Sequence, residues 1–239
     1  MMPENPDQPA YHFSQVRLRG DILQSGKLHL LGRGDGYGWH QALWRMFPSE
    51  EKQPRDFLYR AIEQERIPGF YLVSRRIPED HHELWEIRTK SYVPRLHEDE
   101  RLAFSLRANP RITRKFVSGK AGGKHPPKHD VFMDAKEQFR QQHNGRSPKG
   151  SEWQELLQKV GAEWFLRQGE RLGFAVESVR VDSYQQERFR RGKQDIRFST
   201  TDFEGLLRVR DPEAFRTILF TGLGGSRSFG CGLLLVRKV

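Results

Sequence analysis

The sequence predicts an α+β fold made of two consecutive sandwiches, each with helices packed against a sheet. The chain has 239 residues, which corresponds to about one and a half to two ordinary domains. Helical and strand patterns alternate along it in the approximate order β-α-β-β-β, then α-β-β-α-β. Each half therefore has strands on both sides of a helix, which is typical of the split βαβ arrangement.

Strands dominate the first half of the chain. The predicted strands lie at residues 11–19, 70–74, 85–89 and 102–108. The last of them alternates apolar and polar side chains, as a half-buried strand does. Residues 39–47 instead carry apolar side chains at helical spacing, which predicts a short helix that ends before Pro48. Residues 57–65 fit both helical and alternating spacing, so their pattern alone leaves their structure open.

The second half begins with a change of composition. Residues 111–150 are basic, poor in aliphatic side chains and rich in Gly and Pro, so we expect a linker with long loops and one possible helix at 131–142. Further helices are predicted at residues 153–164 and 211–220, and strands at residues 171–181, 195–200, 203–209 and 229–236. Between Val176 and Val179 the apolar alternation changes phase, which predicts a β-bulge.

Positive charge is concentrated in two clusters. The chain has 41 Lys and Arg against 31 Asp and Glu, so its formal net charge is +10. Residues 107–124 contain six basic side chains, Arg107 among them, and no acid. The second cluster consists of Arg188, Arg190, Arg191 and Lys193, next to Tyr184 and Phe189. Basic side chains interleaved with aromatic ones favour a nucleic acid as partner, although each cluster alone also fits a solvated loop or hairpin.

A glycine-rich segment precedes the last predicted strand. Residues 222–232 contain five glycines, but they lack the lysine of a P-loop and lie between a helix and a strand, the reverse of a dinucleotide fingerprint. Exposed backbone amides next to an arginine suit a phosphate. The candidate contacts are Gly224, Gly225, Ser226, Arg227 and Ser228. The alternative is a tight connection that needs glycines only for its geometry.

His40 is the candidate catalytic residue. If the helix begins near Tyr37, the two side chains lie on one face, and the positive end of the helix disfavours an imidazolium. A neutral imidazole beside a phenol can abstract or donate a proton. The alternative is a structural histidine, because His40 shares its stripe with Leu43 and Phe47.

The sequence argues against a disulfide, a metal site and a membrane anchor. The single cysteine, Cys231, excludes an intramolecular disulfide and a cysteine-rich zinc site, and it suits a reducing cytoplasm. His125, His129 and His143 have no carboxylate or cysteine at ligand spacing, so we expect no metal and no cofactor. No apolar run approaches the ~20 residues that span a bilayer, and the first ten residues do not resemble a signal peptide.

Three segments together resemble the CasE family, the CRISPR repeat endoribonucleases of type I-E Cascade complexes. They are YGWHQALWRMFP at residues 37–48, LRANP at 106–110 and GLGGSRSFGCGLL at 222–234. They occur at the start, middle and end of the chain in the order that the family has. The resemblance implies that residues 57–65 form a strand.

The resemblance also implies two tandem ferredoxin-like (RRM-like) domains. The expected division is an N-terminal domain at residues 1–110 that carries the catalytic histidine, a basic linker or loop region at 111–150, and a C-terminal domain at 151–239 with the glycine-rich RNA-binding loop.

The activity that the resemblance implies is cleavage of precursor CRISPR RNA within each repeat, at the base of the stem-loop. The product stays bound, and the protein is a Cascade subunit. A ribose 2′-hydroxyl attacks the adjacent phosphate without a metal, which leaves a 2′,3′-cyclic phosphate and a 5′-hydroxyl. By resemblance, His40 is the catalytic histidine and Tyr37 its accompanying tyrosine, and the basic hairpin and the glycine-rich loop contact RNA.

Two other functions stay open from the residues alone. A non-catalytic RNA-binding subunit would keep both basic clusters and the glycine-rich loop without cutting RNA. A DNA-binding protein would share the net charge, because phosphate contacts alone do not distinguish the two nucleic acids.

Overall fold

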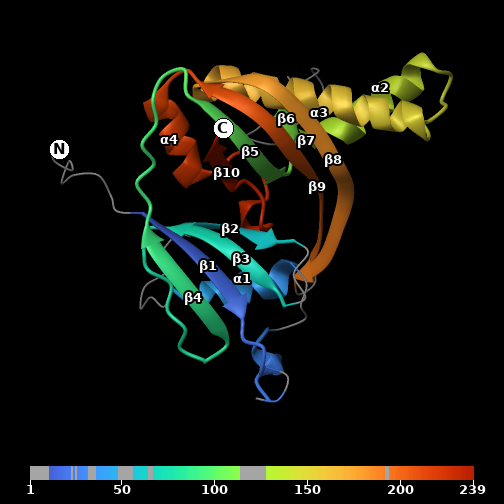
Figure 1. The fold of residues 1–239 in the computed structure, drawn as a ribbon. Helices are drawn as coiled ribbons and strands as arrows, with labels where there is room; N and C mark the ends of the chain where they lie inside the picture. Colours follow the sequence, from blue (N-terminus) through green and yellow to red (C-terminus); the bar gives the residue numbers. More distant parts are fainter. Residues whose placement is uncertain are drawn as a thin grey trace, which may run out of the picture.

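The fold consists of two four-stranded antiparallel sheets, one above the other in Figure 1. The computed structural model describes residues 11–22, 24, 26–31, 36–47, 56–63, 67–113, 128–191 and 194–239. The first sheet contains β1 (His12–Leu18), β2 (Phe57–Ile62), β3 (Gly69–Ser74) and β4 (Trp85–Ser91) in the order β2-β3-β1-β4. The second contains β5 (Arg101–Ala108), β8 (Phe174–Arg191), β9 (Gln194–Val209) and β10 (Leu234–Lys238) in the order β10-β5-β9-β8.

In both sheets, the strand that comes first in the chain lies between the third and the fourth. This order results from two interlocked crossovers and is that of the ferredoxin-like fold. The segment whose pattern is ambiguous, residues 57–65, supplies β2, so it is a strand as the resemblance implies.

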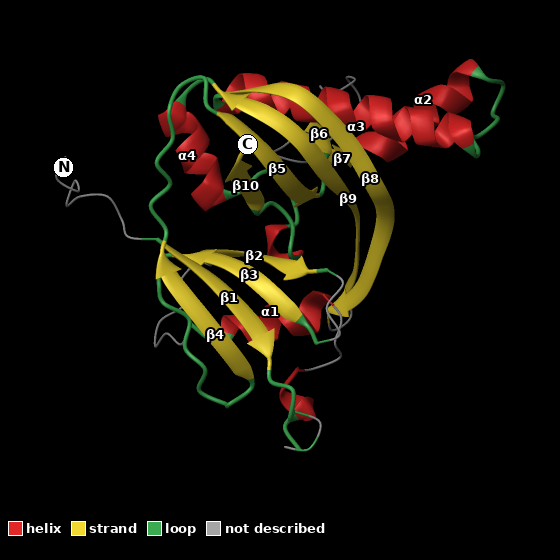
Figure 2. Cartoon of the chain, viewed as in Figure 1, coloured by secondary structure: helices red, strands yellow, loops and turns green. Residues whose placement is uncertain are grey.

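In the first half, α1 (Gly36–Trp44) connects β1 to β2 and covers one face of the sheet (Figure 2). Leu43 of α1 is fully buried there, together with Val16 and Leu72 of the strands. The apolar stripe predicted for residues 39–47 is therefore the face that packs on the sheet. The connection from β3 to β4, residues 75–84, contains no helix.

In the second half, α3 (Ser151–Leu172) and α4 (Pro212–Thr221) cover one face of the sheet (Figure 2). Phe165 of α3 and Phe215 of α4 are fully buried in this core. The helix considered possible at residues 131–142 is present as α2 (Val131–Gln142). It packs along α3, and the two helices project beyond the sheet (Figure 1).

A long hairpin of β8 and β9 curves from the second sheet toward α1 (Figure 1). The predicted bulge is confirmed, because the pairing register shifts between Val176 and Ser178. A second shift lies between Asp182 and Tyr184. Bulges bend and twist a strand, so they direct the end of the hairpin toward the first half. Gly205 lies beside the first bulge, where a Cβ would overlap the carbonyl oxygen of Ser178.

An apolar cluster joins the two halves. Its buried members are Leu58 and Val73 from the first sheet and Leu233, which precedes β10. At its edge the rings of Tyr11 and Phe220 stack with 3.9 Å between their centroids. The second half therefore covers the face of the first sheet opposite α1, which fixes α1 relative to the glycine-rich segment.

The pairing of β5 differs from the predicted division of the chain. The boundary at residue 110 assigns this strand to the N-terminal domain, but it pairs with β9 and β10 in the second sheet. The two sheets therefore divide within residues 92–100, and the domain boundaries themselves stay a prediction. In the region 111–150, the structure has β6 (Arg111–Thr113), β7 (Lys128–Asp130) and α2, while residues 114–127 lie outside the described part.

Three elements in the second half have bounds that differ from the predicted ones. The helix expected at residues 153–164 continues as α3 until Gly173 stops it in a left-handed conformation (φ 80°), so β8 begins only afterwards. The strands expected at 195–200 and 203–209 are one strand, β9. β10 begins later than the expected residue 229, because Gly230 and Gly232 have φ values of 78° and 94°, which a strand does not accommodate.

Candidate nucleic-acid interface

His40 lies in the second turn of α1 with a half-buried side chain. The centroids of the Trp44, Tyr59 and Phe229 rings lie 5.7, 6.4 and 6.4 Å from that of its imidazole. Trp44 and Tyr59 belong to the first half, whereas Phe229 belongs to the glycine-rich segment. His40 therefore stands where the two halves meet, not inside the core of either one.

The start of α1 corrects the electrostatic argument for His40. The helix begins at Gly36, so His40 is outside its first turn. The influence of a helix dipole falls off within one turn. The expectation that the helix end keeps the imidazole neutral therefore loses its basis. α1 includes the position of Tyr37, but the side chain of Tyr37 lies outside the described part.

A cavity of about 600 Å³ lies beside His40. Its lining comes from α1 and the residue after it, from β9 and from the 3₁₀ helix η2 (Arg227–Phe229) of the glycine-rich segment. The lining residues are His40, Gln41, Trp44, Arg45, Ile196, Ser228 and Phe229. The structure thus brings the predicted catalytic residue together with one predicted loop contact, Ser228, and with Ile196 of the hairpin, whereas the described basic side chain of Arg188 does not line this cavity.

Arg45 is a candidate that the sequence patterns did not single out. Its exposed side chain lines the same cavity as His40, and its Nη1 donates to the carbonyl oxygen of Leu30 at 2.5 Å. A guanidinium has five N–H donors, so this hydrogen bond holds the group and leaves others for an anion. The only sequence signal is a basic residue little more than one helical turn after His40.

The glycine-rich segment is attached to both halves near this cavity. Tyr59 of β2 donates from Oη to the carbonyl oxygen of Ser228 at 3.1 Å. The Phe229 ring packs against Phe198 of β9 with 5.1 Å between the centroids. The segment is therefore held between the first sheet and the hairpin.

Asn109, at the end of β5, ties the glycine-rich segment to the base of the hairpin. This residue is 1% exposed. Its carbonyl oxygen accepts from the Gly225 N–H at 3.2 Å, and its Oδ1 accepts from Ser226 Oγ at 3.1 Å. Its Nδ2 donates to the carbonyl oxygen of Ser199 on β9 at 2.8 Å. A Cβ on Gly225 would lie 2.8 Å from Oδ1, so this close approach requires glycine.

Asn109→Ala is expected to lower the free energy of unfolding by about 2 kcal/mol, because it removes two side-chain hydrogen bonds and leaves buried polar partners unsatisfied. Urea denaturation measures the change. The matched control is Gln154→Ala, which removes an exposed amide from α3 and should change stability by less than about 0.5 kcal/mol. Equal midpoints for the two variants would contradict the anchoring role of Asn109.

Arg227 lines a second cavity instead of the one beside His40. Gly224 and Gly225 line this second cavity as well, whereas the neighbouring Ser228 lines the first. Arg227 is half-buried, and its Nε donates to the carbonyl oxygen of Gly224 at 3.2 Å. Burial lowers the pKa of the Arg227 guanidinium from its usual value. The five predicted loop contacts therefore do not all face one site.

The basic hairpin is exposed at Arg188, which pairs with Asp195 across the hairpin at 3.0 Å. Arg190 and Arg191 belong to β8, but their side chains lie outside the described part, as does the whole of Lys193. The contacts of these basic side chains with RNA stay predictions.

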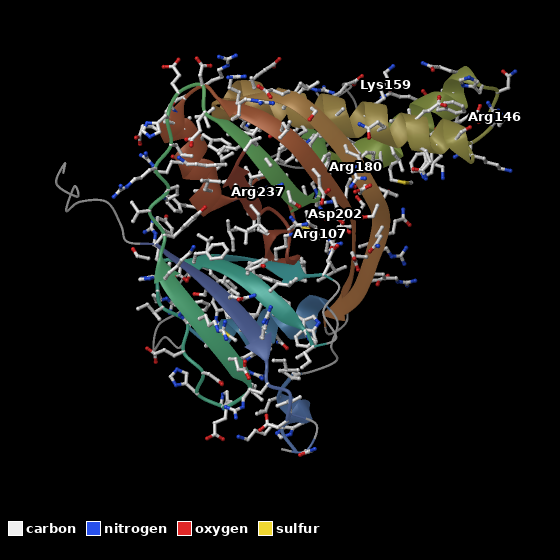
Figure 3. The ribbon with its side chains drawn as sticks, in the orientation of Figure 1. Arg107, Arg146, Lys159, Arg180, Asp202 and Arg237 are labelled. Atoms are coloured by element: carbon white, nitrogen blue, oxygen red, sulfur yellow. The ribbon has the colours of Figure 1, made fainter. Side chains whose placement is uncertain are left out.

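Arg107 is engaged within the protein. Its Nε and Nη2 donate to the two carboxylate oxygens of Asp202 at 3.0 and 2.9 Å, and Nη2 lies 2.8 Å from Glu63. Figure 3 shows Arg107 and Asp202 next to each other between the two sheets. Burial opposes the charge of Arg107, but the hydrogen bonds with Asp202 and the electrostatic attraction of Asp202 and Glu63 together outweigh it and raise the pKa of Arg107. An RNA contact of Arg107 stays a prediction, and its carboxylate partners give it a structural role.

Other reactive groups do not add to the site in the described part of the chain. No three His, Cys, Asp or Glu side chains among the described residues are placed to bind a metal ion, and His125 lies outside them. Cys231 is fully buried, which raises its pKa to about 12, so it carries no reactive thiolate. No described helix combines the length and the apolar character needed to cross a membrane.

Comparisons with known proteins agree with this architecture. A family model described as CRISPR associated protein matches residues 11–238. The Cascade subunit CasE of the CRISPR system of Escherichia coli K12 is 28% identical over 204 residues, which cover 84% of this chain and 90% of that protein. Cse3 of Thermus thermophilus, solved with an RNA that represents a pre-cleavage complex, is 20% identical with a TM-score of 0.66, covering 96% of this chain and 100% of that one.

The crystal structure of Cas6e from Escherichia coli K-12 is similar as well, with a TM-score of 0.62 and 21% identity over 95% of this chain and all of that one. These matches confirm the tandem ferredoxin-like fold. The family match and the CasE relative confirm the resemblance inferred from the segments at residues 37–48, 106–110 and 222–234.

Proposed function

The chain belongs to the family of CRISPR-associated proteins, and from this premise we propose that it is an endoribonuclease that cleaves precursor CRISPR RNA within each repeat. Cleavage takes place at the base of the repeat stem-loop, and the protein stays bound to the mature RNA as a subunit of a Cascade complex. One observation carries the proposal: the half-buried imidazole of His40 shares a cavity with the guanidinium of Arg45 and with Ser228 of the glycine-rich segment. Groups for proton transfer and for phosphate binding thus lie together.

The cavity supports a reaction based on proton transfer. The ribose 2′-hydroxyl loses its proton, and its oxygen forms a bond to the adjacent phosphorus. The bond from phosphorus to the 5′-oxygen breaks, and the leaving 5′-oxygen takes up a proton. His40 either removes the proton from the 2′-hydroxyl or donates one to the 5′-oxygen. Arg45 stabilises the additional negative charge on the phosphate. Among the residues that the structure describes, none that lines the cavity has a carboxylate. The lining residues offer an imidazole and a guanidinium, which perform this chemistry without a metal.

RNA selection rests on the surfaces around the cavity. The hairpin contributes Ile196 to the lining of the cavity, and the glycine-rich segment contributes Ser228 and Phe229. We propose that Arg188, Arg190, Arg191 and Lys193 of the hairpin and residues Gly224 to Ser228 of the loop contact the RNA. An A-form stem hides its base edges in a deep major groove, so the hairpin recognises the shape and phosphates of the stem. Tyr37 accompanies His40 in α1 and completes the proposed catalytic pair.

The proposal is tested by incubating the purified protein with a repeat transcript in EDTA. We expect one cut at the base of the stem, with a 2′,3′-cyclic phosphate and a 5′-hydroxyl at the new ends. A transcript with a 2′-deoxy substitution at the cut nucleotide should bind and stay intact, because the attacking hydroxyl is absent. Cleavage of that deoxy substrate, or a strict need for added Mg²⁺, would overturn the mechanism.

The aromatic rings around His40 also favour a second candidate, a non-catalytic RNA-binding subunit in which the imidazole only packs. Such a protein would bind the repeat stem-loop and leave it uncut at any protein concentration in the same assay. Competition between duplex DNA and the RNA stem-loop at one fixed salt concentration separates both candidates from a DNA-binding protein.

A further inference from the structure

The second cavity, of about 540 Å³, lies between α3, α4 and the glycine-rich segment. Gly222 to Gly225 form one wall, and three arginines contribute to the lining: Arg111, Arg171 and Arg227. The remaining polar side chains include Gln168, Thr217 and Thr221, and no Asp or Glu from the described part of the chain lines the cavity. This volume falls within the range of ~300–1,000 Å³ that is typical of ligand sites.

The three arginines differ from most others in the second half. Arg101, Arg146, Arg180, Arg188, Arg208, Arg210 and Arg216 each pair with a carboxylate. Arg111, Arg171 and Arg227 form no ion pair with any residue that the structure describes, although Arg111 interacts electrostatically with Asp130 over a longer distance. Like charges that share one cavity repel each other, so the arrangement is stabilised when an anion occupies it.

The other polar groups indicate what kind of anion fits. Thr217 and Thr221 donate their hydroxyl protons to the carbonyl oxygens of Glu213 and Thr217 at 3.0 and 2.9 Å. Their oxygens therefore face a ligand as acceptors, and Gln168 offers both an acceptor and a donor. Guanidinium groups for phosphate oxygens, beside acceptors for a ribose hydroxyl, suit a nucleotide better than a simple inorganic anion.

We propose that this cavity binds the phosphodiester backbone of the single-stranded RNA that flanks the repeat stem-loop next to the cut. The inference rests on the proposed function. Arg227 and Ser228 are neighbours in the chain and line the two different cavities. A strand that leaves the reaction centre at His40 can therefore reach the arginines by crossing one loop. Two helices and the loop border the site, and its volume of about 540 Å³ suits a few nucleotides of a single strand better than a paired stem.

The test compares two RNAs: a repeat with its single-stranded flanks and a stem-loop trimmed of them, both with a 2′-deoxy nucleotide at the cut. The double variant Arg111→Ala with Arg171→Ala should weaken binding of the flanked RNA by roughly tenfold or more. Its slope of log K against log salt should become shallower by about 1.4, which corresponds to two lost single-strand contacts. Binding of the trimmed RNA should not change.

The control is Lys159→Ala with Arg237→Ala, which removes the same total charge from two exposed positions outside the cavity (Figure 3). An unchanged Kd of the arginine variant for the flanked RNA overturns the inference. An equal loss for both RNAs also overturns it, because the cavity would then hold the stem. Cleavage by the unmodified protein is measured on the flanked RNA without the deoxy nucleotide. The flanked RNA can bind more weakly to the arginine variant and yet stay uncut by the unmodified protein. That result would contradict the proposed cleavage and would still support the proposed site for the flanking strand.

Discussion

Replacing His40 by alanine is expected to abolish cleavage of the repeat RNA while binding of the stem-loop survives. His40 supplies the only imidazole among the described residues that line the cavity. A positioned general acid or base typically contributes ~10²–10⁴-fold to a rate, so the single-turnover rate constant should fall by at least about 100-fold. The phosphate-binding groups lie on other elements and remain, so the Kd of the stem-loop should change little. Rapid-quench cleavage and equilibrium binding measure the two quantities separately.

A second substitution separates catalysis from packing at this position. His40→Phe keeps a ring among Trp44, Tyr59 and Phe229 but transfers no proton. If His40 is catalytic, this variant folds normally and does not cut RNA. Normal cleavage by His40→Phe would instead show that the imidazole is structural. His82→Ala, at an exposed position away from the cavity, is the control that should cleave at the unmodified rate.

Elements formed by local patterns could be predicted from the sequence. The alternation in β5, the apolar stripe of α1 and the phase change at Val176 each record which side chains face a core, and this information is contained in neighbouring residues. Ends of elements are less accessible, because they depend on single backbone conformations. Gly173 and Gly230 stop or delay their elements by adopting positive φ values, which other glycines of the chain, such as Gly205, do not adopt.

The interactions that assemble the site were beyond local patterns. Asn109 contacts Ser199 and Ser226, which are far from it in the chain, so no spacing rule points to it. The sheet that contains β5 is likewise decided by its partners β9 and β10. His40 was named from its place beside Tyr37 in the predicted helix and again from the family resemblance, and its catalytic role stays a prediction. Arg45 was missed because its place in the cavity depends on where the hairpin and the glycine-rich segment end up.

Asp202→Ala is expected to produce the largest loss of stability, about 3–5 kcal/mol. The carboxylate of Asp202 accepts two hydrogen bonds from Arg107 and one from Ser183 Oγ at 2.8 Å, and it lies 3.8 Å from Nη2 of Arg60. The side chains of Arg60 and Arg107 are only 10% and 22% exposed. Without Asp202, the positive charges of Arg60 and Arg107 face each other in a largely buried environment. Glu63 near Arg107 compensates for little of this, because its own side chain is about half exposed. Urea denaturation followed by fluorescence measures the change.

Asp195→Ala is the matched control, because its carboxylate also contacts two arginines, Arg188 and Arg197, but both are more than half exposed. Solvent screens such pairs, so this loss of stability should be much smaller than that of Asp202→Ala. Adding Arg60→Leu to Asp202→Ala should recover part of the stability, since it removes one of the two orphaned charges. Arg60 lies on β2, whereas Arg107 and Asp202 lie on β5 and β9, so this cluster joins the two sheets. Equal losses for Asp202→Ala and Asp195→Ala would contradict the role of the Asp202 cluster in joining the two sheets.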